Sequence, residues 1–271
     1  MTPTGRLGRA FETARRERRG AFIPFLTSGF PDLVESDRLA LALCEEGADV
    51  LELGVPFSDP IADGPVIQRT TEVALGAGAT LAHVLGQAMR LRARHETPLV
   101  LMTYLNPILR YGETRFAADA AAAGVDGLVL VDLPPEEEPS LWEEVRRHEI
   151  DTIPLVAPTT EASRLPGLIQ KARGYIYVVA RMGVTGHGAG DQAVDTLLER
   201  CRALTQAPRC LGFGIGLDTP IERYRGRAEG VIVGSALLDP ILEASNARGR
   251  EDSARRFMRE FRKKLPALAP A

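Results

Sequence analysis

One acidic residue inside an apolar run, and two more just beyond it, stand out in the stretch DVLELGVPFSDPIADGP, residues 49–65. Glu52 stands inside an apolar run that indicates a buried strand, and Asp59 and Asp63 follow in a segment rich in proline and glycine. Burial penalises a charged carboxylate, so an acid in such a run needs a partner or a reaction to explain it. These residue types suit acid–base chemistry in which one carboxyl exchanges a proton and another stays ionised.

Both candidate acids also have structural interpretations. A buried Glu52 held by an arginine or by backbone amides is the alternative to catalysis. For Asp63 the alternative is an aspartate turn or helix cap in the sequence ADGP. Because side chains alternate along a strand, Glu52 shares a face with Val50, and we expect that face to point into the mouth of the fold.

Glycine-rich segments in the second half of the chain indicate an anion site. They are RMGVTGHGAG (181–190), GFGIG (212–216) and VGSALL (233–238), in which Gly234 and Ser235 open an expected helix. Glycine lets backbone N–H groups approach an anion, and a helix N-terminus adds free donors and a favourable dipole. Ordinary turn glycines are the alternative. Together with the carboxylates, the pattern predicts a phosphorylated small substrate.

The elements that must position these residues follow a strand–helix repeat. Eight short apolar runs, mostly without alternation, indicate parallel strands buried on both faces. The runs are 22–26, 50–55, 99–102, 127–131, 152–156, 175–180, 210–213 and 230–233. Helical patterns separate them, and the sequence therefore predicts an α/β fold, a (β/α)₈ TIM barrel, with a doubly wound open sheet as the alternative.

The ends and the spacing complete the expected organisation. Residues 3–18 predict an extra N-terminal helix and residues 249–265 a C-terminal one, while Pro56 to Gly78 is expected to be a long loop. No linker is apparent, so residues 1–271 are expected to form a single domain. Barrels place active sites at the carboxyl ends of their strands, where Glu52, Asp63 and the glycine-rich loops would meet.

Composition excludes several classes of function. The net charge of −3 gives no reason to expect nucleic acid or a membrane as a partner. The odd number of cysteines, three, and the lack of an apolar leader favour a cytoplasmic protein. No lysine stands at a strand end for a Schiff base, the histidines form no metal-ligand cluster, and no cofactor fingerprint follows the first strand. The class of reaction that remains is acid–base catalysis by carboxylates without a metal ion.

The residues carry a resemblance to a known family. The segments are PFLTSGFPD (24–32), LELGVPFSDPIADGPVIQ (51–68), LMTYLNPI (101–108), VDLP (131–134), GVTG (183–186), GFGI (212–215) and GSA (234–236). In this order they resemble the α subunit of tryptophan synthase over nearly the whole chain. The resemblance implies a lyase that cleaves indole-3-glycerol phosphate to indole and glyceraldehyde 3-phosphate. It also implies an α₂β₂ heterotetramer, in which a β subunit receives indole through a tunnel, with pyridoxal phosphate in that partner and no cofactor in this chain.

The resemblance assigns roles residue by residue. Glu52 and Asp63 match the catalytic pair, and Asp59 matches the loop that meets the β subunit. The positions around the indole are Phe25, Ile67, Tyr177, Thr185 and Phe213. The positions around the phosphate are Gly186, Gly214, Ile215, Gly234 and Ser235. The chain departs from the family pattern at Ala180, Met182 and Gly216.

The chemistry predicts how the two carboxyl groups divide the work. Glu52 would protonate C3 of the indole and, as a base, take the proton of the neighbouring glycerol hydroxyl, while Asp63 would accept the indole N–H. Burial should raise the pKa of Glu52, and the loop should keep Asp63 charged. A stand-alone indole-releasing lyase, a weakly active homologue that mainly activates a β subunit, and another phosphosugar isomerase are the alternatives.

Overall fold

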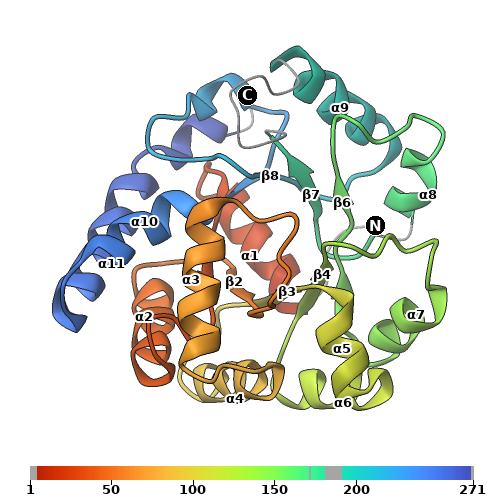
Figure 1. Ribbon diagram of the computed structural model, residues 1–271. Coiled ribbons are helices and arrows are strands. Elements are labelled where there is room, and N and C mark those ends of the chain that lie inside the picture. Colours follow the sequence, from red (N-terminus) through yellow and green to blue (C-terminus); the bar gives the residue numbers. More distant parts are fainter. Residues whose placement is uncertain (1–4, 171, 181–190, 270–271) are drawn as a thin grey trace.

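One curled sheet of nine parallel strands organises the protein in this computed structural model, which describes residues 5–170, 172–180 and 191–269 (Figure 1). The strands are β1 (Ala21–Thr27), β2 (Leu51–Gly54), β3 (Leu99–Thr103), β4 (Gly127–Leu130), β5 (Asp151–Thr152), β6 (Leu155–Val156), β7 (Ile176–Val179), β8 (Arg209–Gly212) and β9 (Gly230–Val233). Their spatial order is β5-β4-β3-β2-β1-β9-β8-β7-β6. Nearly every strand residue is buried, as expected for strands covered on both faces.

The fifth apolar run decides between a barrel and an open sheet. It is split into β5, which pairs with β4, and β6, which pairs with β7. Pro154 stands between them and has no N–H to donate to a ladder. On either side of the split, the N–H of Ile153 bonds to the carbonyl of Leu128, and the N–H of Tyr177 bonds to the carbonyl of Pro154. The segment thus joins both edges of the sheet, which confirms the predicted barrel.

Helices surround the sheet, as Figure 1 shows. They are α1 (Gly5–Arg16), α2 (Leu33–Glu45), α3 (Pro65–Gly76), α4 (Leu81–Arg92), α5 (Leu105–Tyr111), α6 (Glu113–Ala122), α7 (Pro139–Arg147), α8 (Leu165–Gln170), α9 (Asp191–Leu204), α10 (Ser235–Glu243) and α11 (Ala247–Arg262), with short 3₁₀ turns η1 (Ile221–Tyr224) and η2 (Leu265–Leu268). Both expected terminal helices are present, as α1 and α11. Within the described residues, no helix is both long enough and apolar enough to cross a membrane.

The prediction of a long loop from Pro56 to Gly78 was wrong, because this segment contains α3. Pro65 occupies the first turn of the helix, where its missing N–H costs nothing, and Gly64 is the N-cap. Gly78, with a φ of 84°, lies just beyond the C-cap. These are sequence signals of a helix start and stop, so α3 was predictable. The true loop is shorter, and it lies between β2 and α3.

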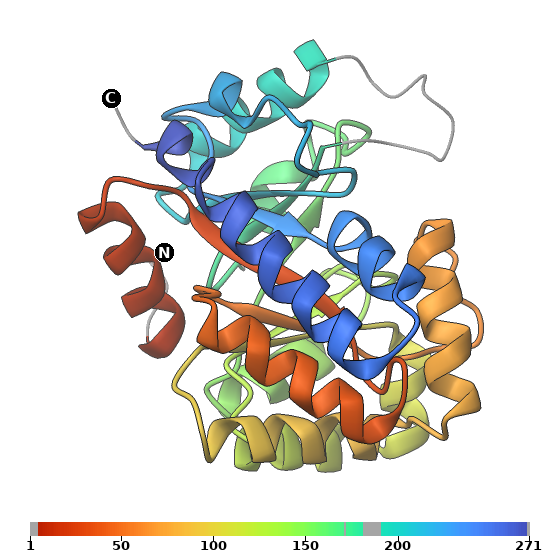
Figure 2. The same cartoon turned by 90° about the vertical axis from the view of Figure 1, so that its left-hand side faces the viewer.

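The N-terminal helix closes the end of the barrel at which the strands begin. Figure 2 places α1 at the opposite side of the molecule from α3 and α10. Leu7 reaches the interior, since a methyl group added at Gly127 would lie 3.3 Å from it. The rings of Phe11 and Tyr175 are 5.8 Å apart, and all three of these apolar side chains are buried. Helix α1 is therefore part of the barrel core.

Two glycines let aromatic rings lie flat across neighbouring strands. A methyl group added at Gly54 would lie 2.3 Å from the ring of Phe25, and one added at Gly212 would lie 2.4 Å from the ring of Tyr177. Both approaches are closer than any real carbon–carbon contact, so a side chain at either position would displace the ring. The two glycines thus fix the positions of two aromatic residues expected at the indole site.

The first prediction concerns this close approach. Gly212→Ala should lower the free energy of unfolding by about 1–3 kcal/mol, because overpacking forces the ring and backbone to shift. Urea denaturation measures the effect. Gly167→Ala in α8 is the matched control, since that glycine has open space around it, and alanine at a helical position should be stabilising by up to about 1 kcal/mol. Equal stability of Gly212→Ala and the native protein would contradict the packing argument.

Candidate active site

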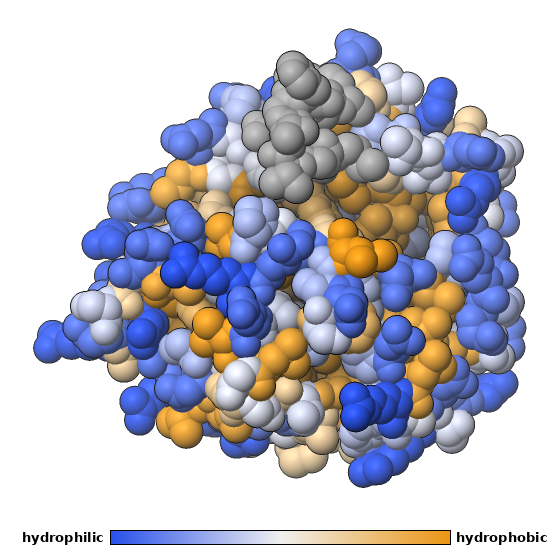
Figure 3. All heavy atoms as spheres, viewed as in Figure 1, coloured by the Kyte–Doolittle hydropathy of each residue, from blue (hydrophilic) through white to orange (hydrophobic). Residues whose placement is uncertain are grey.

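A cavity of about 970 Å³ opens at the carboxyl ends of the strands. Figure 3 views this face and shows an apolar hollow there. Residues from β1, the β2–α3 loop, β7, the segment after β8 and the start of α10 contribute to its lining. The expected residues found in the lining are Phe25, Asp63, Ile67, Tyr177, Phe213, Gly214, Ile215, Gly234 and Ser235. Thr185 and Gly186 lie outside the described residues.

Glu52 lies beneath this cavity and not in its lining. Its side chain is completely buried, and its Oε1 atom accepts a hydrogen bond of 3.2 Å from the hydroxyl of Tyr175. Among the described residues, the other carboxyl oxygen has no hydrogen-bond partner. Burial raises the pKa of Glu52 to about 8, an effect that the Tyr175 hydrogen bond only partly opposes. The expectation that Glu52 points into the mouth therefore differs from this structure, whereas the expected direction of the pKa shift is confirmed.

Neither structural interpretation of Glu52 accounts for this environment. No arginine or backbone amide in the described part of the chain holds its carboxyl group, and the one donor is a phenol. An unsatisfied buried carboxyl oxygen destabilises a fold, and such groups are concentrated at functional sites. In the sheet register Glu52 is level with Phe25, which lines the cavity. Glu52 thus lies one side-chain layer from the substrate-sized space.

Asp63 lines the cavity from the β2–α3 loop. Its Oδ2 atom accepts a hydrogen bond of 3.1 Å from the hydroxyl of Tyr104, which in turn accepts one of 3.1 Å from the N–H of Ala62. The ring of Tyr104 also packs on Phe57, at 5.3 Å between centroids. Tyr104 therefore holds both the loop and the carboxylate, yet the sequence analysis did not single it out.

The pKa of Asp63 is raised as well, to about 6, because the cavity wall and loop desolvate a carboxyl that keeps only part of its access to solvent. The hydrogen bond from Tyr104 opposes this rise. The sequence analysis expected the loop to keep Asp63 charged and did not predict this rise of its pKa. Near pH 7, however, Asp63 is mostly ionised and Glu52 mostly protonated, so the two groups still hold different protonation states.

Aromatic and aliphatic side chains form the wall between the two carboxyl groups. Tyr177 and Phe213 meet edge to face, with their ring centroids 5.7 Å apart. Besides burial, the charges of both Glu52 and Asp63 raise the pKa of Tyr177, so the two acids approach the same ring. Phe213 adopts a left-handed backbone with a φ of 64°, a conformation that a non-glycine residue rarely holds without support from the fold. Such walls suit a flat aromatic group.

At the start of α10, the end of the cavity away from Asp63 offers backbone N–H groups as hydrogen-bond donors. Helix α10 begins at Ser235, directly after Gly234, as the sequence predicted. The carbonyl of Gly234 accepts from the N–H groups of Leu237 and Leu238, which leaves those of Ser235 and Ala236 as the donors without an intrahelical acceptor. Gly214 and Ile215 line the cavity beside this helix start. This end can bind a phosphate group.

The charged groups present define what the site can do. In the described ranges no set of three or more histidine, cysteine or acidic side chains has the geometry to hold a metal ion. The cavity thus combines a buried proton donor below its floor, an ionised carboxylate on one wall, an aromatic slot and an anion-binding end. This arrangement suits acid–base cleavage of a phosphorylated compound that carries a flat aromatic ring.

Comparison with known proteins points to one family. Residues 11–266 match the family model described as tryptophan synthase alpha chain. A tryptophan synthase alpha chain from Solibacter usitatus is 44% identical over 265 residues, covering 97% of this chain and 99% of that protein. Another, from Gluconacetobacter diazotrophicus, is 46% identical over 247 residues, covering 90% of each.

Solved structures agree with the sequence relatives. A chain of Mycobacterium tuberculosis tryptophan synthase superposes with a TM-score of 0.87 at 36% identity over 100% of both chains. The tryptophan synthase alpha chain from Legionella pneumophila gives 0.85 at 36% identity, covering 98% of this chain and 97% of that one. The chain belongs to the tryptophan synthase alpha chain family, the lyases that cleave indole-3-glycerol phosphate to indole and glyceraldehyde 3-phosphate.

Proposed function

We propose that Glu52 and Asp63 carry out this cleavage without a metal or cofactor in this chain. Glu52 donates its proton to C3 of the indole ring, and Asp63 accepts a hydrogen bond from the indole N–H and stabilises the positive charge that develops there. The bond between C3 and the glycerol chain then breaks. Its electrons return to the ring, and ionised Glu52 takes the proton of the adjacent hydroxyl, which becomes the aldehyde. Glu52 thus ends protonated, as it began.

The observation that carries this proposal is the contrast between the two carboxyl groups. A proton donor has to be protonated at working pH, and the buried Glu52, with a pKa of about 8, meets that condition. A charge stabiliser has to be ionised, and Asp63, with a pKa of about 6, meets that one. For its role, Glu52 exchanges its hydrogen bond with Tyr175 for the substrate, which needs rotation of its side chain toward the cavity.

We assign the rest of the substrate to the two remaining parts of the cavity. The indole ring lies among Phe25, Ile67, Tyr177 and Phe213, with Thr185 as a further contact from the segment outside the described residues. The phosphate lies at the N-terminus of α10. Its proposed binding residues are Gly186, Gly214, Ile215, Gly234 and Ser235, of which Gly186 is not described.

We further propose a tryptophan synthase β subunit as the partner, in an α₂β₂ assembly whose pyridoxal phosphate belongs to β. Support comes from the family to which the chain belongs, whose members are alpha chains of tryptophan synthase. Ile61, which is 84% exposed in the loop that carries Asp59 and Asp63, is a residue that such a contact would cover. We expect the protein in the cytoplasm, since its three cysteines are free and buried.

Glu52→Gln should lower the turnover of indole-3-glycerol phosphate by at least about 10²–10⁴-fold, because the amide can neither donate nor accept the transferred proton. Indole release measures turnover, and a thermal melt checks that the protein is folded. Glu260→Gln, an exposed change in α11, is the control and should leave the rate unchanged. Substantial indole release by Glu52→Gln would remove this residue from the mechanism.

Tyr104→Phe tests how Asp63 is held. The lost hydrogen bond stabilises the ionised carboxylate, so its removal should raise the pKa of Asp63 above about 6. Activity depends on the ionised form, so the acid limb of kcat/KM should move by roughly one unit to higher pH. Tyr111→Phe is the matched control, because that hydroxyl donates to the partly exposed Asp119. An acid limb unchanged by Tyr104→Phe would contradict the assignment.

Gly234→Asp tests the phosphate site. A methyl group at this position would lie 3.4 Å from both Ile67 and Phe25, an ordinary contact distance, and the carboxylate of aspartate places a negative charge beside the proposed phosphate. Affinity for glycerol phosphate, measured by calorimetry, should fall at least about 10-fold. Gly234→Asn is the neutral control and should retain more of the affinity. Equal affinities of the two variants would show that the phosphate binds elsewhere.

A further inference from the structure

A second cavity, of about 540 Å³, lies at the end of the barrel opposite the active site. Helix α1, the C-terminal end of α6, the start of β4 and the approach to β5 surround it, and none of its lining residues lines the active-site cavity. Its charged lining residues are Arg6, Arg9, Asp126, His148, Glu149 and Asp151. The reaction proposed above uses none of them.

Asp151 is the unusual member of this set. The residue is only 6% exposed, and burial and the charges of Arg173 and Asp126 act on its carboxylate without any hydrogen bond from the described part of the chain. The charge of Arg173 attracts it, but that arginine is exposed, and burial still raises the pKa of Asp151 to about 6. A buried carboxylate that faces a cavity and lacks a close partner destabilises the empty protein, and a bound cation would remove that cost.

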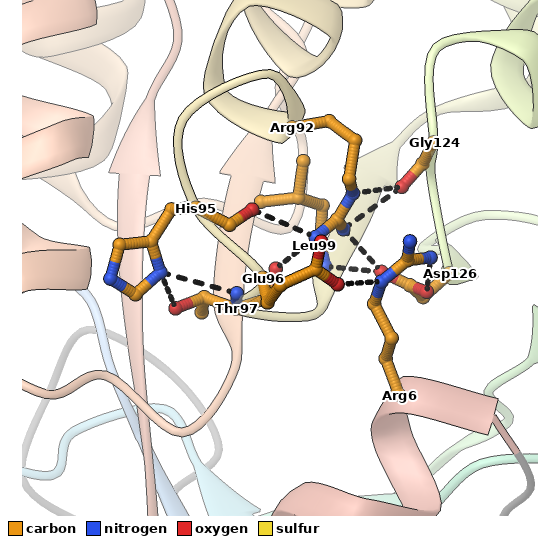
Figure 4. A network of polar contacts seen from close by, with 8 residues as sticks. All are labelled: Arg6, Arg92, His95, Glu96, Thr97, Leu99, Gly124 and Asp126. Atoms are coloured by element: carbon orange, nitrogen blue, oxygen red, sulfur yellow. Dashed lines mark hydrogen bonds and ion pairs between the residues drawn. The ribbon is translucent and has the colours of Figure 1, made fainter.

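Asp126 is different, although it lines the same cavity. Figure 4 shows its carboxylate bonded to Arg6, to Arg92 and to the backbone N–H of Leu99. The distances are 3.3, 2.7 and 2.8 Å, and both oxygens are engaged. Arg6 is also engaged, since it donates to Glu96 as well. Asp126 and Arg6 therefore form a wall of this cavity. Glu149 is exposed, and Asp151 is the buried carboxylate available to a ligand.

A cationic side chain stands at the rim. Arg9 is exposed and lines the cavity, and its guanidinium has no acceptor among the described residues, although it lies close enough to Glu96 to influence the pKa of that residue. The other cationic candidate, His148, lies beside Glu144, at 3.5 Å. The cavity thus offers a buried anion in its wall and a cation at its opening. A metal ion would need several oxygen ligands, and the engaged Asp126 supplies none.

We propose that this cavity binds a small zwitterion of the α-amino acid class, with its ammonium group on Asp151 and its carboxylate on Arg9. The volume accommodates such a molecule. Because α1 supplies Arg9 while the sheet supplies Asp151, the ligand bridges the helix and the barrel. Binding to the folded state alone then raises thermal stability with ligand concentration. The proposal is independent of the catalytic roles assigned to Glu52 and Asp63.

The experiment uses the full chain and a panel of probes. The twenty standard amino acids, β-alanine and γ-aminobutyrate are screened by the shift in melting temperature, and the best probe is then measured by calorimetry. We expect saturable binding at up to millimolar concentration, lost when the amino group of the probe is acetylated. Failure of every probe to bind saturably would overturn the proposal.

Variants separate the two contacts. Asp151→Asn should weaken binding at least about 10-fold while the unliganded protein melts at the same or a higher temperature, because a buried charge is removed. Asp252→Asn, in the exposed part of α11, is the matched control and should bind like the native protein. Arg9→Gln should weaken binding of the amino acid but not of its carboxamide. Unchanged binding by Asp151→Asn, or equal binding of acid and carboxamide by the native protein, would contradict the proposal.

Discussion

The burial of one carboxyl group, that of Glu52, is the constraint on which the rest of the active site depends. A carboxyl at the centre of a barrel is stable only if it is protonated or well partnered, and here a single phenol contacts it. The barrel therefore holds a proton at the level of Phe25, directly below the cavity. A proton held by desolvation remains available near neutral pH, which an exposed glutamate would already have released.

The carboxyl group of Asp63 is desolvated as well, but to a smaller extent than that of Glu52. Asp63 lines the cavity from a loop, keeps partial access to solvent and receives a hydrogen bond from Tyr104. Its pKa consequently rises less than that of Glu52. Glu52 lies in a strand and Asp63 in the loop that follows it, and this difference in depth separates the pKa values of the proposed proton donor and the proposed charge stabiliser. Gly54 and Gly212 then fix the aromatic rings between these groups and the anion-binding end.

Helix α1 contributes both to the second cavity and to the support of the active-site floor. Leu7 and Phe11 close the floor, and Phe11 packs on Tyr175, the phenol that bonds to Glu52. The same helix supplies Arg9 to the second cavity, opposite the buried Asp151 of the sheet. A ligand held between these two charges would therefore contact the helix that supports the floor below Glu52, the proposed catalytic acid.

The sequence by itself predicted the barrel and its terminal helices, and its resemblance to a known family named nine of the residues that line the active-site cavity. Near-continuous apolar runs, glycines at strand ends and an acid inside a strand are local patterns. Such patterns can be recognised in a sequence before the fold is known. The start of α3 is also encoded locally, by Gly64 at the N-cap and Pro65 in the first turn, so the expectation of a loop there was wrong.

Only the tertiary structure decided what holds the two acids. Tyr104 is 41 residues from Asp63, and Tyr175 is 123 residues from Glu52. At such separations, the spacing of residues along the chain does not predict either hydrogen bond. The raised pKa of Asp63 and the unpartnered state of Asp151 likewise depend on which distant segments exclude water from each group. The desolvation of a group depends on which residues surround it in the folded protein, and the sequence alone does not give the positions of those residues.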